Sequence, residues 1–203
     1  MRSLSEIDTI SKRALRAKGF SWGIAEEIGK SVKQLELFGL PGLKNLNQYL
    51  KIYEQNKFQQ IKIISKTNIC LNKFHCPIST GIGFLDQIKS LEKLNLVEFN
   101  KIAYPILFLS FVSRASEVLG KKILIKMDEK EFILNFNQSI FGNYSKNEIW
   151  ENANTVLINF LENNNSFSED EWKEMAKFAN ETFVEESDEL KEKSAGAGLT
   201  DND

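Results

Sequence analysis

The spacing of apolar residues predicts a first helix at the start of the chain. Apolar side chains recur every three or four residues from Leu4 to Ala17, the period of one helix face. Ser3 and Glu6 have the spacing of a capping box, and Gly19 stands where the helix would end. We therefore expect a helix that runs to about Lys18.

A second helix is predicted from Trp22 to Phe38, and we expect it to organise the N-terminal part of the chain. Ser21 is a good N-cap, and Gly39 stands where a left-handed residue ends a helix. Gly29 is one turn after Ala25, so another backbone can approach closely there. The apolar face comprises Trp22, Ala25, Ile28, Gly29, Val32, Leu35 and Phe38.

A third helix is predicted after the turn formed by Gly39, Leu40, Pro41 and Gly42. Pro41 fits the first turn of a helix, because its fixed φ is helical and no hydrogen-bonded N–H is needed there. Three helices joined by short turns predict a small bundle, or a cap on the rest of the fold. The stripe of the third helix comprises Leu43, Leu46, Leu50 and Tyr53.

From Gln60 onward the pattern favours alternating strands and helices. Strand-like runs precede Cys76-Pro77, and Gly81-Ile82-Gly83 indicates a turn that leads into a helix. Ile106–Val112 fits a helix, although a buried strand is the alternative in so apolar a run. The predicted strands are 61–64, 67–74, 96–104, 121–127, 132–136 and 155–161, and the predicted helices are 84–94, 106–119, a short one from Ser145, and one capped by Ser168 and Glu171.

These elements predict an α+β fold, in which an N-terminal unit of three helices packs with a mixed β-sheet and further helices. We place the helical unit at residues 1–56 and the α/β core at residues 57–186. Residues 187–203 form an acidic segment and a glycine-rich C-terminal tail.

Charge and composition limit the classes of partner that the protein is expected to bind. The chain has 203 residues and a formal net charge of −2, with no basic block to neutralise nucleic acid. The first residues lack the apolar segment of a signal peptide, and Ile106–Val112 is too short to cross a membrane. We therefore expect a cytoplasmic protein without nucleic-acid or membrane partners. A homo-oligomer or a complex with a partner enzyme is compatible with the sequence.

Cys76 is the candidate nucleophile. It precedes Pro77 at the expected start of a helix, where a thiol gains nucleophilic character. The alternative is a buried, inert cysteine beside a turn. Two cysteines and one histidine, His75, are too few for a disulfide framework or a zinc site, and we predict no metal. The sequence points to no cofactor.

Two further places are candidates for ligand binding. Arg114 lies on an apolar element, so it must meet a carboxylate, either an internal one such as Glu117 or that of a substrate. Gly81 would offer free N–H groups at a helix start. The tail offers Thr200, Asp201 and Asp203, with Asp201 as a possible base, unless it is only a frayed polar end.

The ordered motifs resemble a bacterial family of unknown function. They are Trp22-Gly-x-Ala-Glu-Glu-x-Gly29, Gly39-Leu-Pro-Gly-Leu43, Cys76-Pro-Ile78 with Gly81 and Asp86, and the terminal Ala195–Asp203. Residues 3–53 also look like the N-terminal helices of the malate/lactate dehydrogenase family. That family has a catalytic Ser-His-Gly turn where this chain has Leu40-Pro41-Gly42, so the resemblance implies no hydride transfer.

Two functions fit these observations. The first is a small enzyme, or enzyme subunit, acting on a small carboxylate-bearing metabolite at Cys76, Gly81, Arg114 and the tail. The second is an adaptor that binds a partner enzyme through its N-terminal helices. Trp22, Gly29, Pro41 and Gly42 are then interface or structural residues.

Overall fold

The structure is a computed structural model, and it describes residues 2–54, 57–144 and 148–182. The chain forms two compact units, Met1–Asn163 and Asn164–Asp203, and each is described by itself. The first unit contains the N-terminal helices together with a sheet, and this confirms the predicted α+β class.

Three helices begin the first unit, as the sequence predicts. They are α1 (Leu4–Ala17), α2 (Trp22–Leu37) and α3 (Gly42–Ile52). Ser3 and Glu6 form the predicted capping box, with the Glu6 N–H 3.1 Å from the Ser3 hydroxyl. Gly39 ends α2 with a φ of +73°, which a residue with a side chain rarely adopts. The predicted cap of α1 and the predicted end of α2 are therefore confirmed.

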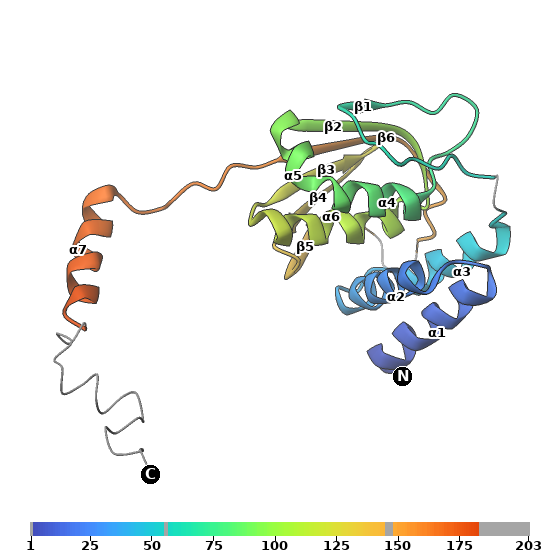
Figure 1. Ribbon diagram of the computed structural model, residues 1–203, viewed down its shortest axis with the longest axis horizontal. Helices are drawn as coiled ribbons and strands as arrows, with labels where there is room; N and C mark the ends of the chain where they lie inside the picture. Colours follow the sequence, from blue (N-terminus) through green and yellow to red (C-terminus); the bar gives the residue numbers. More distant parts are fainter. Residues whose placement is uncertain (1, 55–56, 145–147, 183–203) are drawn as a thin grey trace, which may run out of the picture. The chain divides into compact units, whose positions relative to one another are not determined.

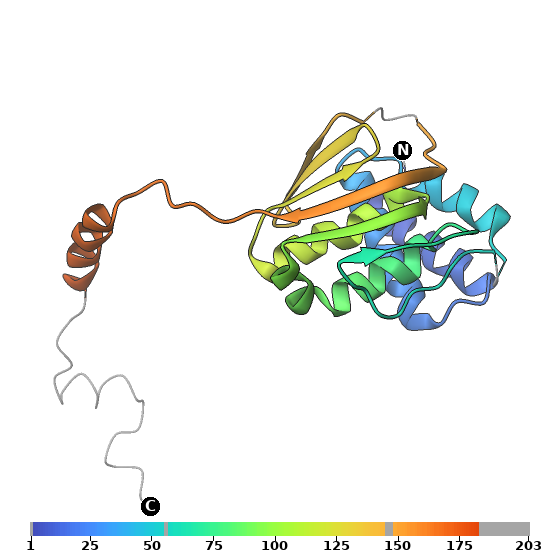
Figure 2. The same ribbon diagram turned by 90° about the horizontal axis from the view of Figure 1, so that it is seen from above.

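A six-stranded mixed sheet completes the first unit, with the strand order β1-β2-β6-β3-β4-β5. β1 pairs with β2 in parallel, and every other neighbouring pair is antiparallel. β6 therefore lies in the middle of the sheet although it comes last in the sequence (Figure 2). The strands are β1 (Thr67–Asn68), β2 (Leu96–Ala103), β3 (Ile123–Met127), β4 (Lys130–Asn135), β5 (Ser139–Gly142) and β6 (Asn152–Phe160).

Helices cover one face of this sheet (Figure 1). They are α4 (Pro77–Asp86), the short α5 (Ile88–Leu91) with the 3₁₀ turn η1 (Glu92–Leu94), and α6 (Pro105–Leu119). Most of α6 is buried, and the helix contacts both the sheet and the N-terminal helices. The apolar run from Ile106 to Val112 is thus a helix, and the strand alternative is wrong.

The second unit contains α7 (Glu169–Asn180). Ser168 and Glu171 form the predicted capping box, with the Glu171 N–H 3.2 Å from the Ser168 hydroxyl. Phe167, one residue before the cap, stacks on Trp172 with ring centroids 5.6 Å apart. This is the geometry of a hydrophobic staple, so the start of α7 is specified by its own residues.

The two strands predicted between residues 61 and 74 are largely missing. Residues 61–64 form no strand, and only Thr67 and Asn68 of the predicted strand 67–74 pair with β2. Side chains replace the ladder there: the Cys70 N–H donates to Asn100 Oδ1 at 2.6 Å, and Asn68 Nδ2 donates to the Glu98 carbonyl at 2.9 Å. These partners are distant in sequence, so the local pattern does not reveal them.

The helix after Cys76 begins at Pro77, seven residues before the predicted start. Gly81 and Gly83 lie inside α4 and form no turn. A Cβ at residue 81 would overlap the ring of Phe111 on α6, so Gly81 allows the two helices to pack closely. Strand β5 was not predicted, and the short helix predicted from Ser145 begins outside the described residues.

Candidate functional site

A groove with mainly apolar walls lies between α1 and α3 in the first unit. Both helices pack on α2, and they leave a cavity of about 630 Å³ between them, near the Gly39–Gly42 turn. Ile10 and Leu43 remain 57% and 37% exposed on its walls. The lining residues of this α1/α3 groove are Ile10, Ser11, Ala14, Glu36, Gly39, Leu40, Pro41, Leu43, Lys44, Leu46, Asn47 and Leu50.

The α1/α3 groove continues toward the N-terminal end of α1. A second cavity of about 550 Å³ shares Ile10 and Leu43 with it and extends to Arg2 and Ser3. The residues that line the two cavities run from Arg2, just before α1, to Ala14 within it. At about 1.5 Å of rise per residue this is roughly 18 Å, the length of a helix of about 12 residues.

Ser11 places an unsatisfied polar group beside this groove. Its side chain is 1% exposed, and its hydroxyl has no hydrogen-bond partner within the described ranges. A buried hydroxyl without a partner costs about 1–3 kcal/mol, so such groups are usually paired. A molecule in the groove with a hydrogen-bonding group above Ser11 would remove this cost.

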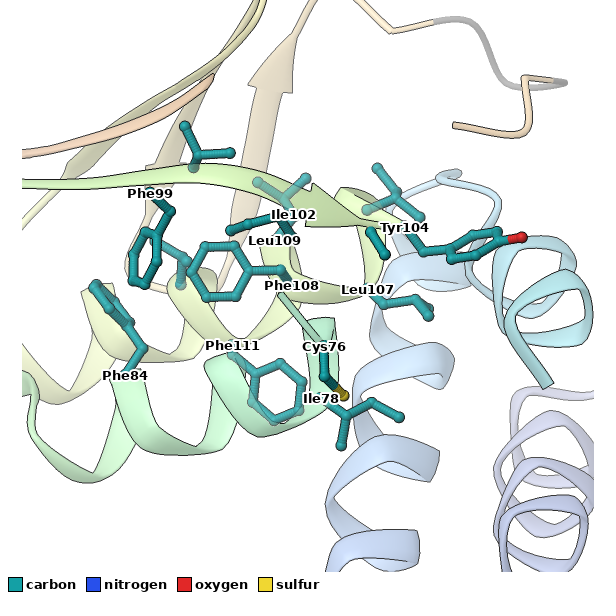
Figure 3. Close-up of a cluster of buried hydrophobic side chains, with 14 of the residues drawn as sticks. Cys76, Ile78, Phe84, Phe99, Ile102, Tyr104, Leu107, Phe108, Leu109 and Phe111 are labelled. Carbon is teal, nitrogen blue, oxygen red and sulfur yellow. The ribbon is translucent and has the colours of Figure 1, made fainter. Parts of the chain in front are cut away.

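Cys76 lines a smaller pocket. It is the N-cap residue of α4, and a cavity of about 320 Å³ adjoins it at the end of α1 and the start of α2. The Cys76 thiol is 1% exposed and lies 3.2 Å from the Tyr49 hydroxyl. Figure 3 shows the side chain among apolar neighbours, close to Ile78. The polar lining residues are Ser21, Tyr53, Gln60 and Ser79.

The partner of Cys76 is held in an aromatic cluster. Tyr49 stacks on Phe58 at 5.2 Å and meets Tyr104 edge-on at 5.8 Å, measured between ring centroids. Burial raises the pKa of Tyr49 far above its ordinary value, and the adjacent Cys76 raises it further. The Tyr49 hydroxyl therefore keeps its proton at physiological pH and cannot serve as a base for the thiol.

His75, next to Cys76, is buried without a good hydrogen bond. It is 2% exposed, and neither ring nitrogen has a partner of hydrogen-bond geometry among the residues that the structure describes. Its ring meets Phe99 edge-on, 6.0 Å between centroids. Burial lowers the pKa of His75, an effect that the nearby Asn68 backbone only partly offsets. A neutral ring against Phe99 is thus the expected state.

The described residues do not bring the predicted ligand-binding groups together. Arg114 forms an ion pair with Glu27 of α2 and is absent from the lining of the Cys76 pocket. Although burial opposes ionisation of Glu27, the hydrogen bonds and charges of Arg114 and Lys30 together outweigh it and lower the pKa of Glu27. Gly81 is buried within α4. Thr200, Asp201 and Asp203 lie outside the described residues.

Of the four residues predicted for structure or interface, Trp22 is exposed, whereas Gly29, Pro41 and Gly42 lie at helix contacts or in the groove. Trp22 is 61% exposed, with the Arg16 guanidinium 4.7 Å from its ring centroid, although the pattern placed it on the apolar face. A Cβ at Gly29 would lie 2.6 Å from Asp8 Oδ1 and 2.7 Å from Lys12 Cγ, so this glycine lets α1 and α2 approach. Pro41 lines the α1/α3 groove, and Gly42 packs against Leu35.

Sequence reasoning did not identify the groove. Ile10 and Leu43 belong to predicted apolar stripes, but periodicity alone does not show which members a neighbouring helix covers. The stripe of α1 turns one side toward α2 and leaves Ile10 at the edge of the contact. The sequence did contain one indication of the groove: α1 and α3, which both pack on α2, each carry an apolar stripe.

Potential metal ligands are dispersed over the part of the chain that the structure describes. Within residues 2–54, 57–144 and 148–182, no three His, Cys, Asp or Glu side chains gather in a way that could hold a metal ion. No helix in those ranges combines the length and apolar character needed to cross a membrane.

The structure describes an α+β fold with a groove between two of its N-terminal helices. Residues 2–73 match the model of a family described as "Protein of unknown function (DUF3726)". This match covers α1, α2, α3 and β1, and it confirms the resemblance to an uncharacterised family. No curated protein and no solved structure matches the chain. Neither a bacterial origin nor the dehydrogenase resemblance has support from these matches.

Proposed function

We propose that this protein is an interaction module that binds an amphipathic helix of a partner protein in the α1/α3 groove. The observation that carries the proposal is the groove itself, with exposed Ile10 and Leu43 on its walls and the unpaired Ser11 hydroxyl beside it. It corresponds to the predicted adaptor role. A cytoplasmic location and the absence of nucleic-acid and membrane partners belong to the same proposal.

The shape of the groove favours a helix as the occupant. α1 and α3 are both packed on α2, so a helix laid between them would complete a four-helix arrangement. Helix-in-groove recognition uses apolar side chains at i, i+3, i+4 and i+7, which fit an apolar groove of this length. Glu36 also caps the N–H of Leu43 at 2.8 Å, which fixes the start of α3 and one wall of the groove.

Peptide selection on the full chain tests this function. A display library of 14-residue amphipathic helical peptides (about 21 Å long at 1.5 Å per residue) is selected against the wild-type protein. We expect Ile10→Asp and Leu43→Asp to abolish binding of the selected peptides, because a carboxylate in the groove would be desolvated. Leu37→Asp is the matched control, because Leu37 is 61% exposed on α2 and does not line the groove.

The outcome distinguishes binding in the groove from nonspecific binding to exposed apolar side chains. Circular dichroism and thermal melting should be unchanged in all three variants, since each replaced side chain is exposed. Peptides that bind Ile10→Asp and Leu43→Asp as well as the wild type would refute the interaction module. Equal loss of binding in Leu37→Asp would refute it too.

A second candidate function is catalysis or binding of a small carboxylate-bearing metabolite at the Cys76 pocket. It is favoured by one observation, the pocket of about 320 Å³ that Cys76 lines together with Ser21, Tyr53 and Ser79. Thermal-shift screening against amino acids, hydroxy acids and nucleotides tests it, because a ligand of the native state raises the melting temperature. The shift should disappear in Cys76→Ala and persist in Cys70→Ala.

A further inference from the structure

The three most exposed large apolar side chains of the described residues lie in one segment, between α3 and α4. Ile63, Leu71 and Ile69 are 82%, 78% and 67% exposed. Single exposed apolar side chains are common on protein surfaces, but a group of them marks a candidate interaction surface. A partner that covers these side chains would gain binding free energy from the burial of apolar area.

Hydrogen bonds to neighbouring elements hold this segment in place. The side chain of Gln87, the C-cap residue of α4, accepts from the Ile64 N–H at 3.2 Å and donates to the Lys62 carbonyl at 2.9 Å. Lys101 of β2 donates to the Leu71 carbonyl at 2.8 Å. The exposed side chains are therefore presented by a backbone that is already ordered, so a partner has little ordering cost to offset.

Residues 67–71 form an unpaired edge of the sheet. β1 pairs with β2 on one side, and no further strand pairs with it among the described residues (Figure 1). After β1, Cys70 exchanges two hydrogen bonds with the Asn100 side chain of β2, at 2.6 and 3.2 Å. Successive residues of an extended chain direct their backbone groups to opposite sides, so Ile69 directs its N–H and carbonyl away from β2. These groups and the Leu71 N–H have no partner within the described ranges.

The surface around this edge is basic. Residues 57–85 include four lysines and no aspartate or glutamate. Lys62 and Lys66 of this stretch are exposed, and Lys101 of β2 lies beside it. Glu98 is the single acidic residue of β2. Complementary charge favours the encounter with a partner and suppresses partners of the same charge, so the expected partner is acidic.

We propose that this edge, together with the side chains of Ile63, Ile69 and Leu71, binds an extended acidic segment of a partner protein, which adds to the sheet beside residues 67–71. In strand addition the main-chain hydrogen bonds give affinity and the alternate side chains give specificity. The partner segment carries apolar side chains at every second position, facing Ile69 and Leu71, and carboxylates between them. This inference goes beyond the α1/α3 groove and does not rest on it.

The backbone of the edge favours a peptide over an anionic lipid surface, although both match the charge. Insertion of Ile69 and Leu71 among acyl chains would also bury their unpaired N–H groups, and hydrocarbon offers no acceptor for them. A peptide strand offers carbonyl groups at the spacing of a sheet. A protein partner is therefore the occupant that satisfies both the side chains and the backbone.

Peptide selection on the full chain tests this inference. The library holds peptides of about nine residues (about 30 Å when extended), with Val or Ile at alternate positions and Asp or Glu between them. We expect Ile69→Asp and Leu71→Asp to weaken binding of the selected peptides at least about tenfold. Leu37→Asp is the matched control, since Leu37 is an equally accessible leucine on α2. Lys66→Glu should also weaken binding, whereas Lys33→Glu on α2 should not.

An N-methyl scan of a selected peptide tests the strand geometry. A methyl group on a peptide nitrogen removes one hydrogen-bond donor, and only every second N–H of an added strand faces the sheet. We therefore expect binding to be lost at alternate positions. Loss at consecutive positions, or at none, would overturn strand addition.

Three further results would overturn the proposal. They are a library that yields no binder, peptides that bind Leu71→Asp as tightly as the wild type, and Leu71-dependent sedimentation with phosphatidylglycerol vesicles in place of peptide binding, which would assign the surface to lipid. Helical peptides selected on the α1/α3 groove should bind Leu71→Asp as tightly as the wild type. A failure of this surface and a failure of the groove are therefore observed separately.

Discussion

α1 and α7 begin with the same chemical device but differ in what covers them. Ser3 with Glu6 and Ser168 with Glu171 form complete capping boxes, and each helix has an apolar stripe. α1 packs on α2 and buries Leu15, whereas α7 buries none of its residues. A helix start is thus encoded within a few residues, while the partner of an apolar stripe is encoded elsewhere in the chain.

The difference predicts that equivalent substitutions have different consequences in the two helices. A change at the contact of α1 and α2 acts on the cooperative unfolding of the first unit. A change in α7 acts on a helix of the second unit. Four measurements separate these effects, from the largest to the smallest.

Gly29→Leu should cause the largest loss of stability. The new side chain would have to displace Asp8 and Lys12 of α1, and overpacking of this kind costs about 1–3 kcal/mol. The denaturation midpoint in urea measures the loss. Lys33→Leu, on the exposed side of α2, is the control and should be nearly neutral. Equal shifts in both variants would contradict the close contact.

Ser3→Ala should lower the stability of the first unit by about 1 kcal/mol, since it removes the cap of a helix that is part of the packed core. Ser168→Ala should leave the same unfolding midpoint unchanged. Its effect should appear in circular dichroism of a peptide of residues 163–182, as a loss of helix. A midpoint that shifts equally in both variants would show that α7 unfolds together with the first unit.

Acidification should weaken the first unit through His75. Because burial lowers the pKa of His75 below its ordinary 6.5, the unfolded chain binds a proton more readily than the folded one. Stability is therefore full above pH 6.5 and falls as the pH drops below it toward the folded pKa. Unfolding midpoints in this window measure the slope, and His75→Gln should reduce it. α7 has no histidine, so its helix content should stay constant there.

The capping carboxylates should give the smallest effect, and the same one in both helices. The backbone N–H of Ser3 lowers the pKa of Glu6, and that of Ser168 lowers the pKa of Glu171. Their stabilising contribution is full above pH 4.5 and is lost as the pH falls through the lowered value. Circular dichroism of the 163–182 peptide reports it for α7, and Glu171→Gln should reduce the pH dependence without abolishing it, because Glu169 and Asp170 remain in the first turn.

Elements defined by neighbouring residues were predictable from the sequence. The capping pairs located α1 and α7, and alternation located β2 and the hairpin of β3 and β4. The predicted helix 106–119 ends where α6 does, before Gly120 with a φ of +62°. In each case the residues that decide the structure lie within one or two turns of each other, so a local pattern contains the information.

Elements defined by distant partners were not predictable. Gly81 looked like a turn residue in the sequence. A glycine is needed there because the ring of Phe111, thirty residues away, leaves no room for a side chain. Residues 69–74 looked like a strand, but Asn100 and Lys101 bind their backbone instead of a neighbouring strand. The same holds for the site. The Glu27 partner of Arg114 and the groove beside Ile10 depend on how α2 packs, which periodicity does not encode.

The central position of β6 has a consequence for folding during synthesis. β2 and the β3–β4 hairpin leave the ribosome first, yet both require residues 152–160 as their common neighbour. Until β6 emerges, each of them presents an unpaired edge to other chains. The N-terminal helices contact mainly one another, so they can pack before β6 is synthesised. Synthesis past residue 160 therefore sets the time at which the nascent sheet stops being prone to aggregation.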